Sequence, residues 1–246
     1  MNFLDINNEN KNVVLLIHPI SFTPQEMKKM VADNLSNDYR YIIPELSGHG
    51  SSTEKFESAE SEAEKIAELL LKNNIEEIDL SFAPSLGGAV LLYLLNDKRL
   101  NIKKCIFEGC SLAQKARFLE MIVRKTVLGY HKKSKKDRNF ALQFVAKETG
   151  EELAEVIADT FIGLDEGSIK NIIHTCGFVK IPDLSKEDQK KCIFCYGSKD
   201  YNLKDAKKIM PRKLGESKLK IWEGFNHCER IAKDNEAYCK FLESEI

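Results

Sequence analysis

The sequence contains no apolar run approaching the roughly 18 to 20 residues that a helix needs to cross a bilayer. Its first residues, MNFLDINNEN, lack both the basic and the apolar segment of a secretory signal. Charge of one sign is not in excess either, because 37 basic residues stand against 38 acidic ones. No global field therefore favours nucleic acid or a membrane, and we expect neither as a partner.

A regular cysteine framework is also missing, since the seven cysteines are an odd number without even spacing. A reduced, soluble, cytoplasmic protein is the simplest interpretation. Cys192 and Cys195 form a CxxC, which could be a redox or metal pair. They lie in the apolar run 191–196, which has the pattern of a buried strand, so their side chains should face opposite sides of a sheet. We therefore predict no redox or metal role for them.

What the sequence does contain is enough apolar material for a core, since 43% of its 246 residues are hydrophobic. Short apolar runs alternate with longer stretches of helical pattern, which is typical of a parallel sheet covered by helices. The predicted strands are residues 13–17, 39–43, 78–82, 104–107, 191–196 and 218–222. The predicted helices are residues 24–35, 59–73, 86–96, 203–210 and 228–243.

One stretch, residues 112–180, interrupts this alternation with a helical pattern and no convincing strand. It contains a charged link at 131–138, which could attract an anionic substrate, although such a run is usually a solvated loop. We therefore predict a core formed by residues 1–111 and 181–246, with residues 112–180 as an all-helical insertion.

The first sign of chemistry is Ser85, in the segment Ala83-Pro84-Ser85-Leu86-Gly87-Gly88. This segment lies between the predicted strand 78–82 and the predicted helix 86–96. A serine on such a tight turn projects its hydroxyl above the sheet, where the next backbone N–H and the helix N-terminus can support negative charge. Ser85 could also be an ordinary helix N-cap, but the strand–turn–helix context favours a nucleophile.

Four motifs, in the expected order, resemble those of the α/β-hydrolase superfamily. They are LIHP at 16–19, PELSGHGSS at 44–52, the Ser85 segment, and an acid and a histidine near the end of the sequence. The chain is similar to small cytoplasmic serine hydrolases with a helical cap. This resemblance implies the α/β class, with a mostly parallel central sheet flanked by helices and the cap at 112–180.

Asp200 and His227 complete the catalytic triad that the resemblance implies. Asp200 ends the motif GSKD after strand 191–196, where a carboxylate can orient an imidazole. His227 ends the motif GFNH after strand 218–222, where it can reach both the serine and the acid. Glu108 is the main alternative acid, because some members of the superfamily place the acid after the strand that corresponds to 104–107. We prefer Asp200 because it lies in the better motif.

The oxyanion hole is expected beside His18 and Pro19, which stand where the resembled family has His-Gly. Pro19 has no N–H to donate, so the predicted donors are the backbone N–H groups of Ile20 and Leu86. The His18 side chain is expected to shape the loop, although it is also a candidate to line the pocket.

The insertion is expected to decide substrate choice. Candidates for the pocket are His18, Phe118, Met121, Phe140, Phe144 and His174, with Ile122, Phe161 and Phe178 as further apolar candidates. Aromatic residues at helical spacing are more often packing than lining, so each one taken singly is expected in the core.

The reaction that the resemblance implies is hydrolysis of a small carboxylic ester through an acyl-enzyme on Ser85. It requires no metal or organic cofactor, and its partner is a small acyl substrate. A thioesterase, a carbon–carbon bond hydrolase or an aminopeptidase would use the same three residues. A non-catalytic ligand-binding protein on the same scaffold is the alternative of another class, and the sequence leaves the oligomeric state open.

Overall fold

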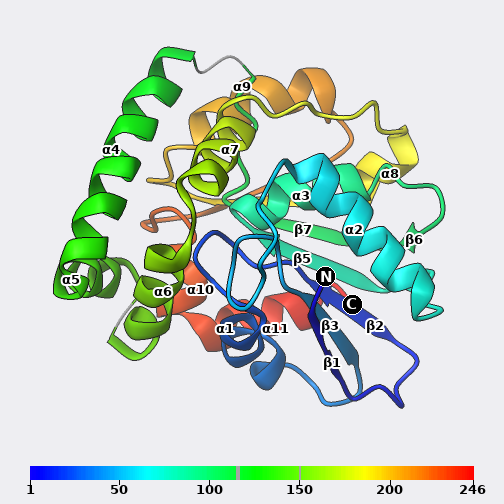
Figure 1. Cartoon of the computed structure of the whole chain (residues 1–246). Helices are drawn as coiled ribbons and strands as arrows, with labels where there is room; N and C mark the ends of the chain where they lie inside the picture. The colour runs from blue at the N-terminus through cyan, green and yellow to red at the C-terminus, as the bar shows by residue number, and fades with distance from the viewer. Residues whose placement is uncertain (115–116, 150) are drawn as a thin grey trace.

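The computed structural model describes residues 1–114, 117–149 and 151–246. Its centre is a seven-stranded sheet in the order β1-β3-β2-β5-β7-β8-β9 (Figure 1). Neighbouring strands are parallel, except that β1 runs antiparallel to β3 at one edge. The strands are β1 (Phe3–Ile6), β2 (Val13–Leu16), β3 (Arg40–Pro44), β5 (Leu80–Pro84), β7 (Cys105–Glu108), β8 (Cys192–Gly197) and β9 (Lys218–Trp222). A separate short pair joins β4 (Glu77–Ile78) to β6 (Asn101–Ile102).

Helices cover both faces of the sheet because its inner strands are apolar on both sides. Every residue of β2 is buried, with Leu15 in one apolar cluster and Leu16 in the other. The first cluster includes side chains of α2 (Ala59–Lys72), α3 (Leu86–Leu94) and α9 (Leu203–Lys213). The second includes side chains of α1 (Pro24–Met30), α10 (Glu229–Lys233) and α11 (Asn235–Glu243). In Figure 1, α2 and α3 lie on one side of the strands and α1 and α11 on the other.

The mostly parallel sheet predicted from the sequence is confirmed, and each predicted strand lies within two residues of an observed one. The edge strand β1 was missed because it is only partly buried and has no continuous apolar run. The predicted helix 228–243 is interrupted at Asp234, between α10 and α11. The predicted helix 24–35 ends at Met30 and is followed by a single 3₁₀ turn, Ala32–Asn34, and a short helix, α8 (Lys186–Lys190), was not predicted.

The two cysteines of the CxxC lie on opposite faces of β8, as expected. Cys192 belongs to the first apolar cluster and Cys195 to the second, and both side chains are buried. All seven cysteines are free thiols. The geometry of a strand therefore separates Cys192 from Cys195, because successive side chains alternate between the two faces.

Ser81 is a buried serine near the start of β5 whose hydroxyl has no hydrogen-bond partner in the described part of the chain. An unpaired buried hydroxyl costs free energy, whereas a methyl group fills the same space without that cost. We therefore expect Ser81→Ala to raise the free energy of unfolding by about 1 kcal/mol, measured by urea denaturation. A lower unfolding midpoint in this variant would show that the hydroxyl is satisfied in the native protein.

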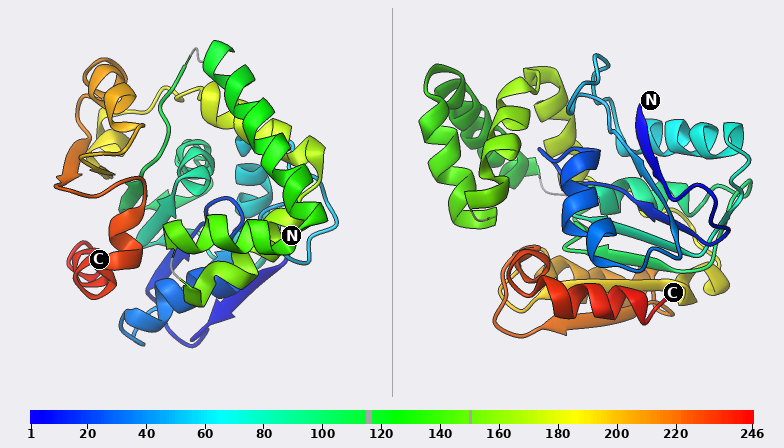
Figure 2. Two further views of the ribbon diagram at one scale, coloured as in Figure 1. Left: turned by 90° about the vertical axis from the view of Figure 1, so that its left-hand side faces the viewer. Right: turned by 90° about the horizontal axis from the view of Figure 1, so that it is seen from below.

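Between β7 and β8, the described ranges contain the short helix α8 and, before it, four longer helices: α4 (Arg117–Lys136), α5 (Arg138–Thr149), α6 (Glu151–Gly163) and α7 (Glu166–Gly177). Figure 2 shows them gathered at one end of the sheet. α4 packs on α7, and α7 in turn contacts α3. Two hydrogen bonds fasten α7 to the loop before α2: the Phe56 N–H donates to Ser168 Oγ over 3.0 Å, and Asn171 Nδ2 donates to the Phe56 carbonyl over 3.0 Å.

The charged link predicted at 131–138 is wrong as a loop, because α4 continues to Lys136. Lysine is a good helix former, and the lysines here point into solvent while His131 and Ser134 are buried. α4 carries too many charges to cross a bilayer, and among the described residues no other helix has the required length and apolar character.

Candidate active site

Ser85 occupies the turn between β5 and α3, at the carboxyl end of a central strand. Its backbone has φ 49° and ψ −112°, a region that residues other than glycine rarely adopt. The Ser85 N–H donates to the Glu108 carbonyl over 2.8 Å, which ties the turn to β7. A Cβ at Gly87 would overlap the carbonyl oxygen of Ile17, so a glycine is required where α3 passes this neighbouring backbone. Ala83, the residue before Pro84, is fully buried in the first cluster.

His227 connects Ser85 to Asp200 through two hydrogen-bonding contacts. Its Nε2 lies 3.0 Å from Ser85 Oγ, and its Nδ1 lies 3.0 Å from Asp200 Oδ2. We assign the tautomer in which Nδ1–H donates to the carboxylate and Nε2 accepts from the hydroxyl, because the carboxylate can only accept. The Asp200 side chain is fully buried and its other oxygen accepts the Asn202 N–H over 2.8 Å.

The loop that carries His227 is held against the end of β8. A Cβ at Gly197 would overlap the carbonyl oxygen of Phe225, so only glycine permits this close approach. Gly224 has φ 87° and Cys228 has φ 52°, so the loop reverses sharply on both sides of the histidine. Tyr201 stacks on the imidazole with ring centroids 4.7 Å apart, while its own side chain is 72% exposed. Sequence reasoning missed this contact, and the only signal was its position directly after the GSKD motif.

Burial and charge act on the His227 imidazole in opposite directions. Burial lowers its pKa, but its contacts with Cys228 and with the Asp200 carboxylate outweigh burial and raise the pKa well above the ordinary value. Burial raises the pKa of the Cys228 thiol. The carboxylate of Asp200 therefore stabilises the protonated ring, which is the form that a histidine acquires when it accepts a proton from a serine.

Glu108, the alternative acid, does not contact His227. It is fully buried, and its Oε2 accepts hydrogen bonds from Trp222 Nε1 at 3.0 Å and from the Tyr238 hydroxyl at 2.7 Å. Its other oxygen has no partner among the described residues. Burial, opposed by these two hydrogen bonds, raises its pKa to about 7. The geometry therefore favours Asp200 as the partner of the histidine.

The two expected oxyanion donors lie in backbone segments that leave their N–H groups available. Leu86 is the first residue of α3, so its N–H has no acceptor within the helix. The N–H of Ile20 donates no hydrogen bond in the described part of the chain, and the next residue, Ser21, has φ 65°. Both are compatible with the expected role, because each N–H remains free to bind an oxygen.

His18 does not line a pocket, which corrects that expectation. Its side chain is fully buried, Nε2 accepts the Leu46 N–H over 3.0 Å, and Nδ1 lies 2.8 Å from the Pro19 carbonyl. Burial and the neighbouring His49 lower its pKa to about 3, so the ring is neutral. His18 therefore joins the loop after β2 to the loop after β3, the structural role expected for its side chain.

Most of the other pocket candidates are not arranged as a buried wall. On α4, Phe118 is 73% exposed and Met121 60%, and Ile122 is exposed as well. Phe144 on α5 is 47% exposed. Phe140 packs edge-on against Tyr130. The expectation of an apolar lining is wrong for Phe118, Met121 and Ile122, because α4 turns a different face toward its neighbouring helices. On α5, the rings of Phe140 and Phe144 pack against Tyr130 of α4 instead.

His174 and the remaining candidates make contacts within the helical segment. His174 stacks on Phe178 with ring centroids 4.9 Å apart, and its Nδ1 lies 3.4 Å from Glu120 Oε1. Phe161 packs edge-on against His131 at 5.4 Å. These aromatic residues serve as packing, which is the role expected for each of them singly.

No protein-family model and no curated protein matches this sequence. Many solved structures, however, match this chain, several of them over nearly its whole length. An α/β hydrolase family protein from Desulfitobacterium hafniense has a TM-score of 0.70 at 17% identity, with 99% of both chains covered. The esterase EaEST from Exiguobacterium antarcticum has a TM-score of 0.74 at 18% identity, covering 98% of this chain and 93% of the other. A bromoperoxidase from Bacillus anthracis has a TM-score of 0.74 at 16% identity, covering 99% and 94%. Likeness at this level of identity establishes the fold.

Proposed function

The chain has the α/β-hydrolase fold, and on this premise we propose that it is a serine hydrolase with Ser85 as nucleophile, His227 as general base and Asp200 as the orienting acid. The observation that carries the proposal is the continuous contact from Ser85 Oγ through the imidazole to the Asp200 carboxylate, at 3.0 Å on each side. Three separate loops at the carboxyl ends of parallel strands supply these residues, and such loops are where open α/β sheets bind their ligands.

The proposed reaction is transfer of an acyl group to water. His227 takes the Ser85 proton as Oγ attacks the substrate carbonyl, and the N–H groups of Ile20 and Leu86 stabilise the oxyanion, each donor contributing about 3 kcal/mol. The protonated imidazole then gives its proton to the leaving group. A water molecule, deprotonated by His227, attacks the acyl-enzyme and releases the acid.

We propose a small carboxylic ester as the substrate and residues 112–180 as a cap over the site. The contact of α7 with α3 supports this position for the cap, because α3 begins at Leu86, directly after Ser85. A thioester, an activated carbon–carbon bond or an N-terminal amide would engage the same residues. The seven free thiols support a reducing, cytoplasmic location.

A panel of p-nitrophenyl esters from acetate to decanoate tests this proposal, with matched thioester and amide substrates alongside. Turnover that rises and falls with acyl length would identify the ester preference. Labelling of Ser85 by a fluorophosphonate without turnover on any of these substrates would indicate a working nucleophile with a narrower substrate. Neither turnover nor labelling would contradict the enzyme proposal and favour a ligand-binding protein on this scaffold.

The pH dependence of hydrolysis follows from the state of His227. The base acts in its neutral form, and its pKa is raised above 6.5, so kcat/KM should increase with pH and reach half its maximum above pH 6.5. Asp200→Asn removes the charge that stabilises the imidazolium. This variant should shift the midpoint to lower pH and reduce kcat by about 10⁴-fold. A wild-type midpoint at or below the ordinary value for histidine would contradict the proposed pairing.

A further inference from the structure

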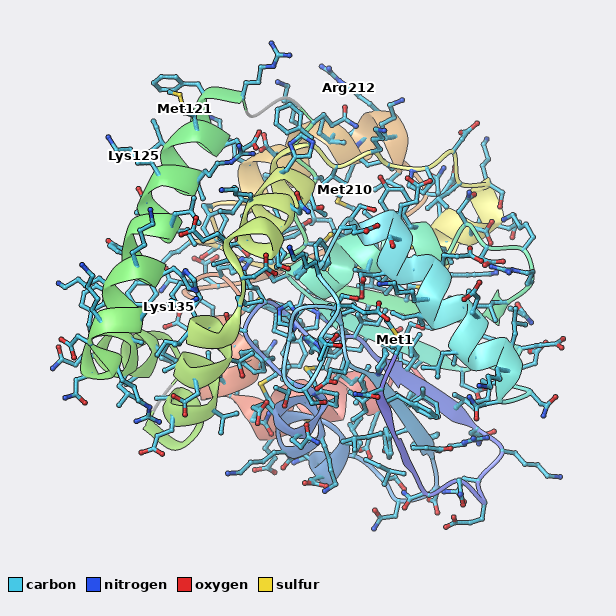
Figure 3. The ribbon with its side chains drawn as sticks, viewed as in Figure 1. Met1, Met121, Lys125, Lys135, Met210 and Arg212 are labelled. Atoms are coloured by element: carbon cyan, nitrogen blue, oxygen red, sulfur yellow. The ribbon has the colours of Figure 1, made fainter. Side chains whose placement is uncertain are left out.

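The outer side of α4 exposes a group of large apolar side chains. Phe118 is 73% exposed, Met121 60% and Ile122 45%. Residues three and four apart lie on the same side of a helix, which places all three on one face. Figure 3 shows Met121 and Lys125 pointing outward from α4, away from the sheet. Exposed apolar clusters of this kind mark surfaces that contact another molecule.

The same helix carries a concentrated positive charge. α4 contains seven basic residues and one acidic residue, so it carries +6, whereas the whole chain carries −1 and the remainder therefore carries −7. The single acid, Glu120, is only 10% exposed and pairs with Arg124. Lys132, Lys133 and Lys136 extend the face of Phe118 and Met121 toward the C-terminal end.

Few contacts within the protein neutralise these lysines. Lys132 lies 3.9 Å from Glu166, and the Lys133 ammonium lies 3.9 Å from the centre of the Phe140 ring. Lys125, Lys135 and Lys136 have no ion pair in the described part of the chain. The face therefore has apolar side chains at one end and ammonium groups along the rest, and of these only Lys132 has an ion-pair partner among the described residues.

We propose that this face, residues Phe118, Met121, Ile122, Lys125, Lys132, Lys133 and Lys136, docks on an anionic lipid bilayer. Apolar side chains enter the boundary between headgroups and acyl chains, while the long lysine side chains extend their ammonium groups to lipid phosphates. A second copy of the chain docked by the same face would bring +6 against +6, and nucleic acid would leave the apolar end uncovered. An anionic bilayer complements both parts of the face, the apolar side chains and the lysines.

This inference revises the expectation that the protein has no membrane partner. That expectation was based on the charge balance of the whole chain, which conceals the separation between α4 and the remainder. The remainder, at −7, is repelled by an anionic surface, so the charge distribution orients α4 toward it. The proposal does not depend on the proposed catalytic function, because binding is measured without substrate.

Sedimentation with vesicles tests the proposal. The wild-type protein should bind vesicles of phosphatidylcholine mixed with phosphatidylglycerol at about 0.1 M salt, and should be released at about 1 M salt. Lys132→Gln/Lys133→Gln/Lys136→Gln should weaken binding about a hundredfold, at about fivefold per lysine. Phe118→Gln/Met121→Gln/Ile122→Gln should weaken it about tenfold or more without any change in charge. Circular dichroism checks that each variant is folded.

The matched control is Lys204→Gln/Lys207→Gln/Lys208→Gln on α9, which removes the same charge from three exposed positions on another helix. It should keep binding close to that of the wild type. The proposal is overturned if this control loses as much binding as the α4 variants, if vesicles of phosphatidylcholine alone bind equally well, or if no vesicle binds. It is also overturned if the apolar variant dissociates a dimer in solution while vesicle binding is unaffected.

Discussion

Replacement of Ser85 by alanine is expected to lower kcat/KM for ester hydrolysis by about 10⁴-fold or more, because it removes the hydroxyl that attacks the substrate carbonyl. Ser85 Oγ is the atom that lies 3.0 Å from His227 Nε2. The measurement is steady-state hydrolysis of the preferred p-nitrophenyl ester, with fluorophosphonate labelling on the same samples. The variant should lose both turnover and labelling.

Ser81→Ala provides a matched control for this result. It removes a serine hydroxyl from β5, four residues before Ser85, where the side chain is buried and has no hydrogen-bond partner among the described residues. Activity should remain close to that of the wild type. Undiminished turnover in Ser85→Ala would rule out Ser85 as the nucleophile, whereas equal losses in both variants would indicate a general effect on β5.

The second large effect is expected at Glu108, which joins three elements of the core. Glu108→Ala would leave Trp222 Nε1 and the Tyr238 hydroxyl as buried donors without acceptors and would open a cavity. We expect this variant to lose about 3 to 5 kcal/mol of stability, measured by urea denaturation at about pH 5. Glu108→Gln keeps an oxygen for both donors and should lose far less.

The comparison of Glu108→Gln with the wild type should depend on pH. Burial raises the pKa of Glu108 from 4.5 to about 7, so the folded protein binds the proton more tightly than the unfolded chain. The stabilisation that protonated Glu108 gives the folded state is therefore complete below pH 4.5 and is lost as pH rises to about 7. The free energy of unfolding falls by about 3 kcal/mol over this range. Glutamine cannot ionise. Between pH 4.5 and about 7, the free energy of unfolding of Glu108→Gln should therefore rise relative to that of the wild type. A difference between the two proteins that does not change with pH would contradict the raised pKa of Glu108.

The central strands could be predicted because parallel strands covered on both faces must be apolar throughout. β2 and β8 are buried at every residue, and both were recognised from their runs of apolar side chains. β1 could not be recognised in this way, because it lies at the edge and pairs antiparallel with β3 through partly exposed residues. Its position depends on a partner that follows it in the chain by more than thirty residues.

The residues of the candidate site could be located for a related reason. Ser85, Asp200 and His227 each follow a strand of the sheet, and the carboxyl ends of parallel strands share one edge. The partners of Glu108 were not predictable, because Trp222 and Tyr238 are 114 and 130 residues away. Helical spacing likewise showed that α4 has faces, but it could not show which face the neighbouring helices would cover.

The packing of α11 has a consequence for the order of events during synthesis. Glu243 on this helix accepts the Ser36 N–H over 2.6 Å across 207 residues, and the ring of Tyr238 packs on Phe82 of β5 at 5.8 Å. A nascent chain from which α11 has not yet emerged leaves Phe82 uncovered and Glu108 without one of its two donors. The proposed hydrolysis should therefore appear only after α11 has left the ribosome, so turnover in a translation reaction would report chains that include this helix.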